Sequence, residues 1–141
     1  LCLTLEPVRN PRRTDGLDWT LCVNTRHDES RRRFSIAHAI GHLVLHSDRI
    51  GDGLCDDTAY SCPGDGPHPN PRIGRDAERA ANQVAVGILL PKGAVVRRHR
   101  EAADLESLAR HFKVSRKAMR IRLESLDLPL PPTHAIVAAT R

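Results

Sequence analysis

The sequence of 141 residues predicts a single α+β domain, in which a small N-terminal β-sheet packs against two helices and a C-terminal helix-turn-helix segment follows. Two stretches, residues 1–7 and 18–24, alternate apolar and polar side chains with the period of a strand. Residues 35–47 and 75–90 repeat apolar side chains at helical spacing instead. Nearer the C-terminus, two further helical stretches flank a short Lys-Val-Ser turn.

The predicted sheet begins with a hairpin-like pair of strands. We expect Pro7 to end the first strand, because proline cannot donate a hydrogen bond to a neighbouring strand. Residues 10–16 then have the composition of a turn, and the second strand, residues 18–24, follows. Cys22 in this strand and Cys2 in the first are expected to be small, buried side chains.

Both long helices carry recognisable end signals. Residues 35–47 begin with Ser35 as the candidate N-cap, and Phe34 can pack back onto the first turn. Residues 75–90 are ended by Pro91. The apolar positions of this second helix are mostly small and allow another element to approach closely: Ala77, Ala80, Ala81, Val84, Ala85, Ile88 and Leu89.

Residues 48–74 form a long loop rich in glycine and proline, as is typical of lids, binding loops and disordered segments. Its two cysteines, Cys55 and Cys62, could form a local disulfide, although in a cytosolic protein two free thiols are the better expectation. Prolines break the helical pattern near the C-terminus, where residues 134–139 could form a short strand.

The composition is that of a soluble globular protein, with 40% hydrophobic and 28% charged residues. No run approaches the roughly 18 apolar residues of a membrane span and no signal-peptide pattern opens the chain, so we expect a cytoplasmic protein without membrane contact. The first residue is Leu1 and not Met, which leaves open whether native residues precede it. The net charge of +5 could attract nucleic acid or an acidic protein, but an arginine-rich genome produces the same charge without binding.

Two histidines suggest a metal site. His38 and His42 stand at i and i+4 on one helix face, a spacing that lets both imidazoles bind one tetrahedral ion. Taken alone this spacing is a weak signal, because two histidines on a polar helix face are more common. The second helix offers Glu78 as a third ligand, which would leave a fourth position open for water. Asn82, one turn further along, is placed to hydrogen-bond a ligand imidazole and fix its tautomer.

Three blocks of sequence, in order, resemble the ImmA/IrrE family of metallopeptidases. Residues 33–46, RFSIAHAIGHLVLH, are similar to its signature RFTIAHELGHLLLH. Residues 78–91 are similar to its second block, and residues 108–124 to a helix-turn-helix that follows the metal site. The resemblance implies a gluzincin-like zinc endopeptidase that cleaves Xre-family repressors or antitoxins, and so controls transcription of stress, phage or mobile-element genes.

Carried over to this chain, the resemblance makes His38, His42 and Glu78 the zinc ligands, although such a set also accepts Mn²⁺ or Fe²⁺. It also puts Ala39 at the position of the catalytic general-base glutamate. Alanine cannot take the proton of the attacking water, whereas metal binding should survive. The intact motif around Ala39 favours a catalytic glutamate replaced in an otherwise active peptidase over a natural pseudoenzyme.

Two further residues lie near this motif in sequence. His46 continues the histidine series, but it is one more turn away, about 6 Å along the helix axis, and is expected either to pack in the core or to contact a ligand side chain without binding the ion. Tyr60 in the long loop could donate a hydrogen bond to a developing oxyanion, although a single loop tyrosine is more often a surface residue.

Two rival functions remain. A DNA-binding regulator could act through residues 105–126, whose second helix has four basic residues, Arg116, Lys117, Arg120 and Arg122. Its apolar residues imply that much of this helix is buried. The second rival function is that of a metal-holding module that sequesters a repressor without cleaving it. We assign residues 1–100 to a metallopeptidase core, 101–128 to the helix-turn-helix segment packed on it and 129–141 to a tail.

Overall fold

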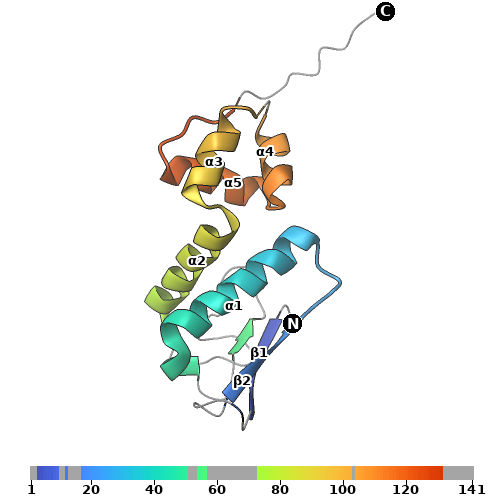
Figure 1. Ribbon diagram of the computed structural model, residues 1–141, viewed down its shortest axis with the longest axis vertical. Helices are drawn as coiled ribbons and strands as arrows, with labels where there is room; N and C mark the ends of the chain where they lie inside the picture. Colours follow the sequence, from blue (N-terminus) through green and yellow to red (C-terminus); the bar gives the residue numbers. More distant parts are fainter. Residues whose placement is uncertain are drawn as a thin grey trace, which may run out of the picture. The chain divides into compact units, whose positions relative to one another are not determined.

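The computed structural model describes residues 3–9, 12, 17–50, 54–56, 73–102 and 104–131. Within these residues the chain is mostly helical, with five helices and three short strands (Figure 1). Contacts divide the chain into two compact units, Leu1–Leu89 and Leu90–Arg141, here called unit 1 and unit 2. Unit 1 combines the strands with two helices, whereas unit 2 is helical in the residues described. The domain boundaries predicted from the sequence, after residues 100 and 128, are not tested by this division and stay predictions.

The strands of unit 1 are antiparallel, in the order β2-β1-β3. β1 (Leu3–Arg9) pairs along its length with β2 (Leu17–Val23), as the predicted hairpin requires. β3 (Leu54–Asp56), for which the sequence has no signal, pairs only with Leu3–Leu5 of β1. The prediction that Pro7 ends the first strand is wrong, because β1 continues to Arg9 with Pro7 opposite Trp19. Among the described residues, Pro7 lies where β1 has a neighbour on one side only, and such an edge tolerates a missing N–H.

The first helix, α1 (Glu29–Ile50), begins six residues before the predicted start at Ser35. The carboxylate of Asp28 accepts hydrogen bonds from the backbone N–H of Arg31 (3.0 Å) and the hydroxyl of Ser30 (2.6 Å), so Asp28 caps the helix. These bonds hold the pKa of Asp28 below its ordinary value. Ser35 is a buried residue inside the helix instead. The backbone leaves helical geometry at His46 (φ −138°, ψ 28°), which gives α1 a kink.

The second helix, α2 (Arg75–Leu89), matches its prediction to within one residue and packs closely against α1. A Cβ added at Gly41 of α1 would lie 2.8 Å from the carbonyl oxygen of Ala81, so the two backbones approach as closely as glycine and alanine permit. The small residues Ala77, Ala81 and Ala85 are buried along α2. This close crossing fixes the spacing between any side chains that the two helices direct towards each other.

The strands pack on this helix pair through β2. Trp19 and Leu21 of β2, with Leu43 of α1, lie against a small core of Ile50, Ile73 and Ala77. The predicted packing of an N-terminal sheet on the two helices is therefore present, although the described residues are more helical than an even α+β mixture. Cys22 is exposed, so the prediction of a buried side chain is wrong there. On a small sheet with one covered face, alternate residues of β2 turn away from the core.

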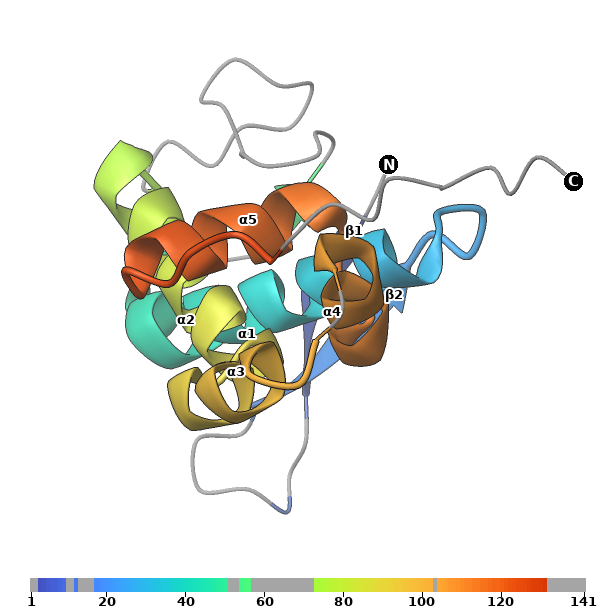
Figure 2. The ribbon, with the colours of Figure 1, turned by 90° about the horizontal axis from the view of Figure 1, so that it is seen from above.

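Unit 2 contains α3 (Lys92–His99), α4 (Leu105–Phe112) and α5 (Arg116–Ser125). The bounds of α4 and α5 agree with the sequence prediction, whereas α3 has no counterpart in it. Figure 2 shows α4 running across the direction of α5. The core of unit 2 consists of fully or nearly fully buried apolar side chains: Leu90, Val95, Leu108, Ala109, Met119 and Leu123.

Several predictions concern residues outside those described: the side chains of Cys2, Cys55 and Cys62, the loop residue Tyr60, and the strand at 134–139. No helix in the described parts of the chain is long and apolar enough to cross a membrane.

Candidate metal centre

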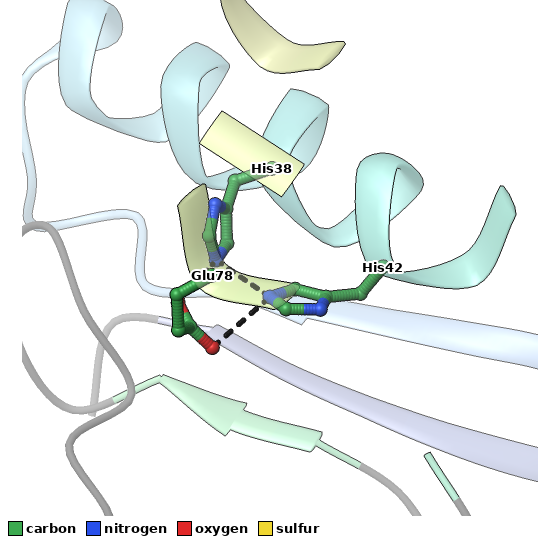
Figure 3. Close-up of side chains that lie close together, drawn as sticks. All are labelled: His38, His42 and Glu78. Carbon is green, nitrogen blue, oxygen red and sulfur yellow. Dashed lines mark hydrogen bonds and ion pairs between the residues drawn. The ribbon is translucent and has the colours of Figure 1, made fainter. Parts of the chain in front are cut away.

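Three ionisable side chains meet in the interior of unit 1. His38 and His42 extend from α1 towards Glu78 on α2 (Figure 3). All three are buried, with exposed fractions of 3%, 0% and 6% respectively. Apolar surroundings penalise buried charge unless it is paired or coordinates a metal. Burying these three groups together therefore costs free energy, which a bound metal ion would offset.

The distances between the facing atoms fit a single small ion. His38 Nε2 lies 3.0 Å from His42 Nε2, and the two Glu78 oxygens lie 3.3 Å from His38 Nε2 and 3.2 Å from His42 Nε2. Ligand atoms bound tetrahedrally to zinc at about 2.0–2.1 Å are themselves separated by about 3.3 Å. Among the described residues, the Glu78 oxygens have no hydrogen-bond donor apart from these imidazoles. The donor set therefore fits a divalent ion.

The protonation of Glu78 is favourable for this role. Burial raises the pKa of its carboxyl group, but hydrogen bonds and charge interactions with His38 and His42 lower it more strongly, to about 2. The group is consequently an anionic ligand at neutral pH, whereas a protonated carboxyl would have to lose its proton before binding a metal.

His38 is held in place from both sides. Its Nδ1 lies 3.0 Å from Oδ1 of Asn82, and Nδ1–H donation to this oxygen leaves the Nε2 lone pair directed at the site. The ring of Phe34 stacks on His38, with centroids 6.2 Å apart and planes 20° from parallel. From the sequence, Phe34 is expected only to contact the start of the helix, and its i, i+4 spacing to His38 is the signal that predicts this stacking.

Ala39 is buried beside the site, with an exposed fraction of 1%. Its methyl group can neither accept nor donate a proton. The described residues thus supply a complete set of three metal ligands but no carboxylate at the position that follows the first histidine. The arrangement can hold a Lewis acid, but position 39 offers no general base.

His46 is near the group without belonging to it. Its ring centroid lies 5.5 Å from that of His42, at the kink of α1, and its side chain is not among the three that converge. Burial and the neighbouring His42 and Arg49 lower the pKa of His46, which favours a neutral ring. The roles expected from the sequence agree with this position. The kink itself has no sequence signal, since neither glycine nor proline occurs there.

Two histidines one turn apart and a glutamate from a second helix form a His₂Glu set, the class of site that could hold a metal ion in a helical protein. Within that class the chain belongs to the IrrE N-terminal-like domain family of M78 peptidases, whose model matches residues 6–124. Comparisons with curated proteins and with solved structures found no significant match.

Proposed function

We propose that unit 1 binds one divalent metal ion through His38, His42 and Glu78, with zinc favoured over manganese or iron. With alanine at position 39, unit 1 binds a protein substrate but does not hydrolyse it. Membership of a peptidase family supports peptide-bond hydrolysis as the class of reaction for which the site is built. The observation that carries the proposal is the buried, correctly spaced group of three ligands next to a position that lacks the base.

Each side chain has a distinct part in this proposal. A bound zinc ion would supply Lewis acidity towards a peptide carbonyl. Asn82 and Phe34 orient His38, and Glu78 adds a negative charge to the site. General acid–base catalysis typically contributes about 10²–10⁴-fold to a rate, which is the part that Ala39 cannot supply. The ligands are intact, which favours a replaced catalytic glutamate over a long-standing pseudoenzyme.

The substrate proposed from the family resemblance is an Xre-like helix-turn-helix repressor or antitoxin. The test compares this chain with its Ala39→Glu and Ala39→Gln variants, using the Xre-like protein encoded nearest this gene, with added zinc and with a chelator. Glutamine has the size of glutamate but is no base, so it is the matched control for any disturbance at this buried position.

We expect all three proteins to bind zinc, and only the Ala39→Glu variant to cleave, in a reaction that the chelator stops. A His42→Ala change in the Ala39→Glu background should abolish both zinc binding and cleavage. If no variant cleaves while all hold metal and bind the repressor, the chain is a sequestering module instead. Failure of the original chain to bind zinc would overturn the metal site itself.

A further inference from the structure

The net positive charge of this protein comes from one of its two units. Residues 90–141 contain eleven Lys and Arg against five Asp and Glu, a net charge of +6, whereas residues 1–89 contain eleven against twelve, a net charge of −1. A general preference for arginine would enrich both units. The density of Lys and Arg is instead higher in unit 2, with eleven in 52 residues against eleven in 89, which indicates a surface adapted to an anionic partner.

Much of this charge is on the exposed face of α5. Arg116, Lys117 and Arg120 are exposed, whereas Met119 and Leu123 on the opposite face are completely buried in the core of unit 2. Arg122 is used internally, because its Nε donates to the carbonyl oxygen of Leu90 (3.0 Å). The helix is thus anchored by one face and presents the other, which resolves the conflict between basic and apolar residues in its sequence.

The exposed basic residues Arg116, Lys117 and Arg120 all lie in the first half of α5. Arg116 forms an ion pair with Glu106 of α4 (3.3 Å), in which the arginine side chain is still 66% exposed. Ile121, one position beyond Arg120, is 51% exposed. The exposed acidic residue Glu124 lies near the C-terminal end of the helix. An exposed surface of two arginines, one lysine and an isoleucine is therefore concentrated at one end of α5.

Local hydrogen bonds fix how α4 leads into this end of α5. Asp104 and Ser107 form a reciprocal capping box at the start of α4, with the Ser107 N–H bonded to the Asp104 carboxylate (2.6 Å). Lys113 ends α4 in the left-handed conformation (φ 54°). Ser115 then caps α5 by accepting from the N–H of Ala118 (3.1 Å). Two helices joined by three residues with defined geometry form a helix-turn-helix unit.

We propose that unit 2 binds double-stranded DNA by placing the N-terminal half of α5 in the major groove. The groove of B-form DNA, about 12 Å wide, admits one helix, whereas that of A-form RNA is too narrow. Arg116, Lys117 and Arg120 would contact phosphates and guanine edges, and Ile121 would contact a thymine methyl group. This function is separate from the metal site and goes beyond the function proposed for unit 1.

The test measures fluorescence anisotropy of a labelled duplex of about 20 base pairs, or two helical turns, titrated with the full chain at several salt concentrations. The test variant is Arg116→Ala/Lys117→Ala/Arg120→Ala. The matched control is Lys92→Ala/Arg97→Ala/Arg100→Ala, which removes the same charge from exposed positions in and just after α3. Thermal melts verify that both variants fold. If the α5 variant does not fold, a Lys117→Glu/Arg120→Glu variant replaces it in the test.

We expect the α5 variant to bind DNA about tenfold or more weakly. Its salt dependence (log K against log salt) should flatten by about 0.9 for each phosphate that the variant no longer neutralises. The α3 variant should be affected much less. DNA binding should persist in the presence of a chelator and should be the same in the Ala39→Glu variant. Failure of the DNA-binding proposal can therefore be distinguished from failure of the metal-site proposal. Equal weakening in the two variants, tighter binding of duplex RNA, or no binding at low salt would each overturn the proposal.

Discussion

Units 1 and 2 differ in where they keep their functional groups. Unit 1 has almost no net charge and gathers three ionisable side chains in its interior, where two helices cross at the distance of a glycine–alanine contact. Unit 2 is strongly basic, has a purely apolar core among its described residues, and displays its charges on the outside of a capped helix. A buried site therefore depends on packing to within a fraction of an ångström, whereas an exposed site depends on the orientation of one helix.

The largest effect is expected from Gly41→Ala. The new Cβ would meet the backbone of Ala81 at 2.8 Å, which neither helix can relieve by a side-chain rotation. We expect unit 1 to be destabilised by about 1–3 kcal/mol and zinc affinity to fall because Glu78 moves with α2. Trp19, the sole tryptophan of the chain, packs on the core of unit 1, so its fluorescence during denaturant unfolding reports this change.

The control for this change is Gly87→Ala, on the exposed side of α2, where a Cβ meets nothing within 4 Å. Alanine is the better helix former by about 1 kcal/mol, so this variant should be slightly more stable. If Gly41→Ala proves equally harmless, the close crossing does not determine the geometry of the site.

A smaller effect is expected from Asn82→Ala, which removes the acceptor for Nδ1 of His38 but leaves the three ligands in place. Removing such a hydrogen-bond partner typically lowers metal affinity about 10–100-fold. Competition with a chromogenic chelator measures this, and Asn82→Asp, which keeps an acceptor oxygen, should retain most of the affinity. Unchanged zinc affinity in Asn82→Ala would mean that Phe34 and the helix alone orient His38.

The smallest effect is expected in unit 2, from Asp104→Ala. Removing this cap should destabilise α4 by about 1 kcal/mol, whereas Asp104→Asn, which can still cap, should cost much less. Hydrogen exchange of the α4 amides measures the loss of stability. The Trp19 unfolding transition should not move. A shift in that transition would show that the two units do not unfold independently.

Local sequence signals predict the bounds of α4 and α5 in unit 2 more closely than those of β1 or β3 in unit 1, although α3 has no counterpart in the prediction. The bounds of α4 and α5 follow from Ser115, which caps α5, and from the apolar period of each helix. By contrast, β3 is three residues long and has no pattern of its own, because only its pairing with β1 makes it a strand. The predicted start of α1 is wrong because Asp28 and Ser35 are both good capping residues, and burial of Ser35 decides between them.

The types and order of the functional residues can be read from the amino-acid sequence alone. The spacing of His38 and His42 puts both imidazoles on one helix face, and Ala39 removes a base wherever the helix lies. Folding is what brings Glu78 to within 3.3 Å of them, because contacts across 36 residues of chain to His42 and 40 to His38 depend on how closely α1 and α2 pack. In the same way, the basic residues of α5 are evident in its sequence, but burial of Met119 and Leu123 determines which of its faces is exposed. Spacing along a helix is a local property of the backbone, whereas burial and distance between elements arise only when their surfaces meet.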